Sequence, residues 1–147
     1  MKARFVISYK ANKLARGIFF LLSDSEEILF QHLAESGSPY ALPTNNGPLP
    51  EGEYTIDSLS TITSQTNPDD WQSFTLQNYG WFASITPLFI TDRSNLGLHP
   101  DGGVEGSRGC IVQLFEDIES NVQCHNLIRD GLVNGKIPLT VMMVGRS

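Results

Sequence analysis

Apolar and β-branched side chains recur in short segments along the chain, and polar turn residues separate these segments. Several of the segments alternate apolar and polar positions, which is the period of a strand with one buried face. Strands are predicted over residues 3–9, 17–22, 28–33, 53–57, 81–90 and 137–144. The residues between them are rich in breakers: Ser36–Pro39 ends the first group of strands. Residues 42–52 (LPTNNGPLPEG), with three prolines and two glycines, predict a constrained loop.

One segment, residues 115–132, has the apolar spacing of a helix. Acidic residues near its start suit the positive end of the helix dipole, and Gly131 and Gly135 offer stop signals. We find no internal repeat, low-complexity tract or linker, so a single domain over residues 1–147 is expected. The pattern predicts a mainly β fold with one substantial α-helix at about 115–132.

Composition excludes several classes of protein. The 147 residues (16.3 kDa) suffice for a hydrophobic core without disulfide or metal. A net charge of -6 argues against a broadly basic, nucleic-acid-binding surface. Two cysteines are too few for a disulfide framework or a four-cysteine zinc site. Neither a signal peptide nor a membrane-spanning segment is predicted, because every apolar run is short.

The segment with the clearest chemical potential is residues 96–114, LGLHPDGGVEGSRGCIVQL. His99 precedes Cys110, and the intervening glycines allow the backbone to turn tightly and approach a ligand closely. An imidazole can accept a thiol proton and so activate the sulfur as a nucleophile. Strands on either side of the loop would bring the two side chains together. Backbone N–H groups around Arg108, Gly109 and Cys110 would then face an oxyanion. The alternative is that Cys110 is an unreactive core thiol.

These residues resemble a known family. GLHPDGG…GSRGCI is similar to the active-site motif of the L,D-transpeptidase (YkuD-type) fold, in which a histidine precedes a Ser/Thr-x-Gly-Cys turn. The upstream SGSPY…NNGPLPEGEYTI resembles that fold's Ser-Gly and Pro-x-Gly-x-Tyr elements. The resemblance covers about residues 36 to 114. It is nearest to small L,D-transpeptidase-like toxins that type VI secretion systems deliver into rival bacteria.

The resemblance implies a β-sandwich-like catalytic domain that acts on peptidoglycan stem peptides. It assigns Cys110 as nucleophile, His99 as general base, and Ser107, Arg108 and Gly109 to the active-site turn. The thiolate would attack the carbonyl at the L-centre of the third stem residue, commonly diaminopimelate, and release D-Ala. Water would then complete an L,D-carboxypeptidase reaction, or an amine a transpeptidation. No metal or other cofactor is implied.

Two departures from the family pattern favour the toxin type over the wall cross-linking enzymes. Many of those enzymes carry a histidine immediately before the Gly-Cys pair, where this chain has Arg108. The separation between His99 and Cys110 is also shorter than in those enzymes. Arg108 is either a ligand for a substrate carboxylate or a solvated side chain, and the sequence favours neither. The order of His before Cys argues against papain-like and NlpC-type amidases.

Arg93 and Asp101 are further candidate substrate-binding residues, although a surface loop arginine and a turn-forming aspartate are the simpler interpretations. Asp101 with His99 and Cys110 matches no common zinc pattern, so no metal site is predicted. Adjacent helical positions do not face one another. Cys124 is therefore expected to pack in the core rather than to pair with His125. His32 is expected to be structural. The aromatic residues that could line a cleft, or simply pack, are Trp71, Tyr79 and Trp81.

The resemblance implies peptidoglycan stem peptides, a cognate immunity protein and a secretion apparatus as partners. The net charge and the short apolar runs predict neither nucleic-acid binding nor membrane insertion. A monomer is expected. The protein would be made in the cytoplasm and act in the periplasm of a target cell after dedicated secretion. Two alternatives stay open. One is a non-catalytic peptidoglycan-binding or secretion- or phage-associated module, and the other is a cysteine endopeptidase that cuts another wall amide.

Overall fold

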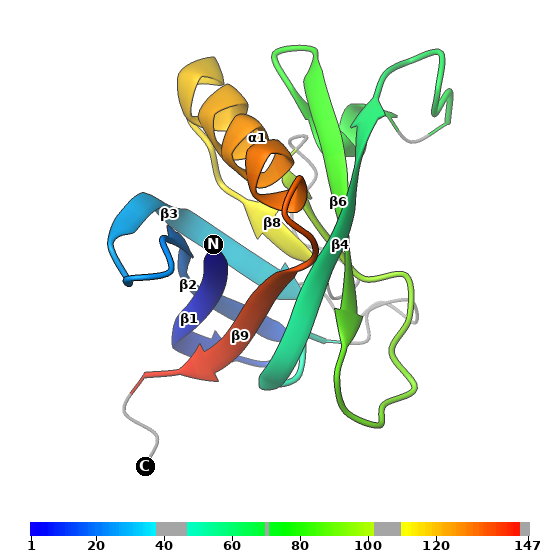
Figure 1. Ribbon diagram of the computed structural model, residues 1–147. Coiled ribbons are helices and arrows are strands. Elements are labelled where there is room, and N and C mark those ends of the chain that lie inside the picture. Colours follow the sequence, from blue (N-terminus) through cyan, green and yellow to red (C-terminus); the bar gives the residue numbers. More distant parts are fainter. Residues whose placement is uncertain (38–46, 70, 102–109, 145–147) are drawn as a thin grey trace.

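The computed structural model describes residues 1–37, 47–69, 71–101 and 110–144. Within these ranges the chain forms nine strands, one α-helix and a short 3-10 turn (Figure 1). The strands are β1 (Lys2–Ala11), β2 (Leu14–Leu22), β3 (Ile28–Gly37), β4 (Gly52–Ile62), β5 (Thr75–Leu76), β6 (Tyr79–Pro87), β7 (Gly97–Pro100), β8 (Ile111–Gln113) and β9 (Ile137–Met143), with η1 (Trp71–Phe74) and α1 (Ile118–Leu132). The prediction of a mainly β fold with one helix is confirmed.

Hydrogen bonds join the described strands into one sheet that closes on itself. The order is β4-β9-β1-β2-β3-β8-β7-β6, and β6 pairs again with β4. Eight strands thereby form a barrel, to which β5 adds a short hairpin on β6. Most neighbours are antiparallel, whereas the pairs β1–β9 and β7–β8 are parallel. The β-sandwich is not confirmed, because β4 pairs with both β9 and β6 and so leaves no second, separate sheet among these strands.

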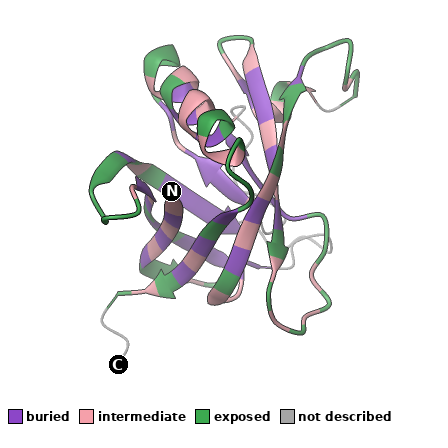
Figure 2. Ribbon diagram, viewed as in Figure 1, coloured by how far each residue is buried: buried purple, intermediate pink, exposed green. Residues whose placement is uncertain are grey.

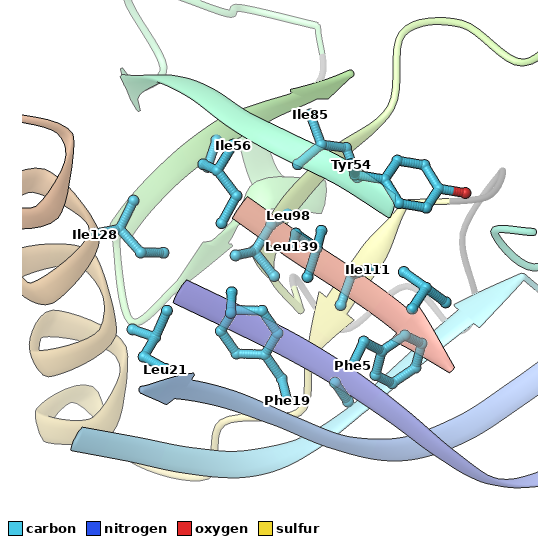
Figure 3. Close-up of a cluster of buried hydrophobic side chains, with 14 of the residues drawn as sticks. Phe5, Phe19, Leu21, Tyr54, Ile56, Ile85, Leu98, Ile111, Ile128 and Leu139 are labelled. Atoms are coloured by element: carbon cyan, nitrogen blue, oxygen red, sulfur yellow. The ribbon is translucent and has the colours of Figure 1, made fainter. Parts of the chain in front are cut away.

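The core fills the interior of the barrel. Along β1 the buried residues alternate with less buried ones, as a strand with one inward face requires (Figure 2). Inward side chains from strands that are distant in sequence meet there. Figure 3 shows Phe5, Phe19, Leu21, Tyr54, Ile56, Ile85, Leu98, Ile111, Ile128 and Leu139 in this cluster. The core explains why β7 and β8 are fixed in place: Leu98 and Ile111 are both fully buried in it.

The helix α1 lies across one end of the barrel, next to β4 and β6 (Figure 1). It begins at Ile118, not at residue 115, because Asp117 has extended backbone and caps the helix by accepting a hydrogen bond from the Ser120 N–H at 2.7 Å. The helix buries Cys124 and Ile128 in the core. The Asn121 side chain accepts a hydrogen bond from Trp81 Nε1 at 2.7 Å, which fastens the helix to β6.

Several strand boundaries differ from the prediction. The strand β3 continues past residue 33 to Gly37, so it includes the first two residues of the predicted Ser36–Pro39 break, because Ala34, Glu35 and Ser36 pair with β8. The other two residues of that segment lie outside the described residues. The strand β6 begins at Tyr79 and ends at Pro87, and Ile90 is fully exposed. Residues 71–76, which the sequence left unassigned, form η1 and β5. Across the described ranges, no helix has the length and apolar character needed to cross a membrane.

Candidate active site

The strand β7 carries His99 on the outer face of the barrel. Leu98 pairs with Ala83 of β6 and faces the core, so the neighbouring His99 points the other way. His99 is nevertheless buried, with 6% of its surface exposed. Two aromatic rings enclose the imidazole: Phe74 meets it edge-on at 4.6 Å between ring centroids, and Phe82 lies nearly parallel to it at 6.0 Å.

A backbone carbonyl fixes the orientation and tautomer of His99. The Nδ1 atom lies 2.8 Å from the Pro100 carbonyl oxygen, which can only accept a hydrogen bond. Nδ1 therefore carries the proton, and Nε2 of the neutral ring is left as a base. Burial lowers the pKa of His99 to about 4, and the hydrogen bond to Pro100 opposes this shift only in part. The imidazole is consequently neutral at pH 7.

Cys110 lies on the same face of the sheet as His99, immediately before β8. In the parallel pair β7–β8, Leu98 is opposite Ile111 and His99 is opposite Val112. Continuing this register by one residue places Cys110 opposite Gly97. Two contacts agree: the thiol lies 3.9 Å from the Asn95 carbonyl oxygen, and the Gly97 N–H hydrogen bonds to the sulfur.

His99 and Cys110 are therefore diagonal neighbours on adjacent strands. Strand spacing and rise set the separation of their Cα atoms at about 8 Å, within reach of an imidazole and a thiol that point from the same face. Burial raises the pKa of the Cys110 thiol, and the Gly97 N–H offsets part of that rise. At neutral pH the resting pair is thus a thiol and a neutral imidazole. The proton has to move as the sulfur attacks, so His99 is suited to act as a general base.

Glycines lie on both sides of Cys110 on this face, Gly97 on β7 and Gly37 on β3. A Cβ atom on Gly97 would lie 2.1 Å from the ring of Phe82, which occupies that space and packs on His99. Gly37 has φ +85, and a Cβ atom there would lie 2.0 Å from the Lys13 carbonyl oxygen. The missing side chains at these two positions let the Phe82 ring and the Lys13 backbone approach the sheet closely on either side of the thiol.

The other predicted site residues do not all join this pair. Ser107, Arg108 and Gly109 lie outside the described residues. Asp101 donates its backbone N–H to the Gln113 carbonyl at 3.0 Å and so prolongs the β7–β8 pairing.

Arg93 donates from Nη1 to the Gly47 carbonyl oxygen at 3.3 Å. Its charge also acts on Tyr54, whose pKa burial raises to about 12 against the opposing effect of Arg93. Arg93 thus acts at least on Gly47 and Tyr54, and its backbone N–H also donates to Thr91 Oγ1 at 3.2 Å.

In the second Cys/His pair, Cys124 packs in the core, as the sequence predicts. Cys124 is fully buried there, and no disulfide joins it to Cys110. The His125 ring packs against Tyr79 and Trp81, and its Nδ1 lies 3.0 Å from the Tyr79 hydroxyl. Trp81 is completely buried, so it packs in the core and lines no cleft. His32 packs on Phe115 and Phe30, which also agrees with a structural role.

Sequence reasoning missed the groups that surround the pair. The Pro100 carbonyl has no side-chain signal. The two aromatic walls, Phe74 and Phe82, come from segments distant from the motif, and nothing in their local sequence sets them apart. Glu35 is a further omission: it is a charged residue in a strand, two positions before the Gly37 that adjoins Cys110, and only 5% of it is exposed. A charged residue inside an otherwise apolar strand is the signal that would have drawn attention to it.

No group of three histidine, cysteine or acidic side chains that would hold a metal ion occurs in residues 1–37, 47–69, 71–101 and 110–144. Among known proteins, no family model and no curated sequence matches the chain.

Proposed function

We propose that the protein is a cysteine-dependent peptidoglycan-modifying enzyme with L,D-carboxypeptidase activity, L,D-transpeptidase exchange activity or both on tetrapeptide stems. The observation that carries the proposal is the parallel register of β7 and β8, by which His99 and Cys110 share one face. The resemblance of the motifs to the L,D-transpeptidase fold supplies the substrate class. Assignment of the domain to that fold is part of the same proposal.

The proposed reaction begins with proton transfer. Nε2 of His99 takes the Sγ proton as the sulfur attacks the carbonyl carbon at the L-centre of the third stem residue. The tetrahedral intermediate collapses when His99 returns the proton to the nitrogen of the leaving D-Ala. This leaves a thioester on Cys110. His99 then removes a proton from water or from an incoming amine, which attacks the thioester and restores the thiol.

The biological role that we propose is that of an interbacterial toxin, active in the periplasm of the target cell after delivery by a type VI secretion system. A cognate immunity protein would protect the producing cell. This part of the proposal rests on the GPLPEGEY and HPDGG…SRGC motifs, which resemble the small toxins of that class.

The enzymatic proposal is tested with purified tetrapeptide muropeptides and mass spectrometry of the products. We expect the wild-type protein to convert tetrapeptide to tripeptide, or to exchange the terminal D-Ala for an added D-amino acid. Cys110→Ala should abolish both, while Cys124→Ala serves as the matched control and should keep them. Unchanged tetrapeptide with wild-type protein, or full conversion by Cys110→Ala, would refute the proposal. Cleavage at a different amide bond would indicate the cysteine endopeptidase instead.

A non-catalytic peptidoglycan-binding module is a second candidate, and one observation favours it. Burial raises the pKa of the Cys110 thiol, which lowers its resting reactivity. Alkylation with iodoacetamide at neutral pH separates the two functions. An enzyme that uses Cys110 should be alkylated at this residue and lose activity in proportion. A binding module should resist alkylation as Cys124 does, because that thiol is fully buried.

A further inference from the structure

An ion pair lies on the same outer face of the barrel as the proposed catalytic pair. Arg16 of β2 is opposite Glu35 of β3, and Glu35 is opposite Val112 of β8. The Nε atom of Arg16 lies 3.3 Å from the Glu35 carboxylate. Because Val112 is also opposite His99, these residues form one row across four neighbouring strands.

This ion pair differs from the others in the part of the chain that the structure describes. The Glu35 side chain is 6% exposed, whereas the acidic partners in the remaining pairs are between 20% and 92% exposed. A carboxylate is costly to bury and is retained in such a position only when it is paired. Arg16 itself is 53% exposed. The pair thus has a buried anion that holds an accessible guanidinium.

The geometry of the contact leaves the binding edge of Arg16 available. Glu35 engages Nε, so the two Nη groups retain the planar fork that binds a carboxylate through two parallel hydrogen bonds. The register also places Glu35 beside Cys110: Glu35 is two residues from Gly37, which adjoins Cys110. Their Cα atoms are therefore diagonal neighbours, about 7–8 Å apart.

We propose that Arg16, positioned by Glu35, binds a carboxylate at the far end of the third stem residue, and this inference rests on the proposed function. Diaminopimelate carries a carboxylate six bonds from the carbonyl carbon that Cys110 attacks, a span of about 7 Å when extended. The carboxylate of the leaving D-Ala is only three bonds from the attacked carbonyl carbon. That distance is too short for this carboxylate to reach the Arg16 side of Glu35. The pair thereby selects diaminopimelate stems over lysine stems, since lysine lacks this carboxylate.

The test compares four synthetic tetrapeptides: a diaminopimelate stem, the same stem amidated at the far carboxylate, a lysine stem, and a diaminopimelate stem ending in D-alaninamide. The wild-type protein should prefer the first over the second and third by about 10- to 100-fold in kcat/KM, the range of a charged hydrogen bond. Arg16→Gln should remove this preference and leave the lysine stem within about twofold. Glu35→Gln should weaken the preference in the same direction, mainly through KM.

Arg4→Gln is the matched control. Arg4, on β1, forms an exposed ion pair with Glu26 at 2.7 Å, so its replacement should not alter the preference. The ratio between substrates does not depend on how much of a variant is folded. Equal losses on all four stems would show a structural role and overturn the inference. The inference would also be overturned if Arg16→Gln no longer reduced kcat/KM on the stem that ends in D-alaninamide. That result would identify the D-Ala carboxylate as the ligand of Arg16. Failure of the wild-type protein on every stem would instead refute the proposed function.

Discussion

The wild-type protein should lose unfolding free energy in acid because His99 becomes protonated, and His99→Gln should lack this loss. His99 has a pKa of about 4 in the folded protein, against an ordinary value of 6.5. The unfolded chain therefore binds a proton on this residue more readily than the folded protein. The contribution of the neutral imidazole to the free energy of unfolding is fully present above pH 6.5 and is lost as the pH falls toward 4. The difference of about 2.5 pKa units corresponds to about 3 kcal/mol at pH 4.

Urea unfolding at pH 7, 6, 5 and 4 measures this effect. Carboxylates whose pKa is lowered, such as Asp57, also lose stability in acid, so the comparison must be between variants. The free energy of unfolding of the wild-type protein should fall by about 3 kcal/mol more than that of His99→Gln between pH 7 and 4. Parallel pH profiles for the two proteins would show that His99 titrates normally. Burial between Phe74 and Phe82 would then not lower the pKa of His99.

Three further predictions concern the site and its support. Gly97→Ala should cost about 1–3 kcal/mol in chemical unfolding and reduce turnover, because the new methyl group displaces Phe82; unchanged values would contradict the packing seen there. Asn121→Ala should destabilise the protein by about 1–3 kcal/mol through the orphaned indole N–H of Trp81, and near-ultraviolet circular dichroism should report the loosened ring. The pH profile of kcat/KM should be flat from about pH 5 to 8, since His99 is already neutral there, and a fall below pH 6.5 would contradict this.

The sequence predicts the longer strands and the helix because their hydrophobic periods are regular. Its limits appear at β7 and β8, strands of four and three residues in which every residue is buried. Alternation cannot identify such strands, since neither face meets solvent. The start of the helix is predicted three residues too early: Phe115 continues the apolar pattern, but its side chain packs on Phe30 before the helix starts at Ile118.

The sequence predicts the residue types of the candidate site and that flanking strands bring them together, but it does not predict the register of those strands. His99 and Cys110 are evident from the motif, whereas their parallel register depends on pairings with β3 and β6 that are far away in sequence. The carbonyl that orients His99 belongs to the backbone of Pro100, which any residue would supply. Glu35 and Arg16 come together only because β2 and β3 are paired, so no local motif marks them.

The measurement that tests the central claim most directly is the intact mass of the protein during turnover. Mixing the wild-type protein with excess diaminopimelate tetrapeptide and quenching in acid should trap a thioester. We expect a mass increase equal to the tripeptide acyl group, located on Cys110 by peptide mapping and absent from Cys110→Ala. His99→Gln should accumulate it more slowly. Product formation without any adduct on Cys110, or an adduct on another residue, would contradict the account.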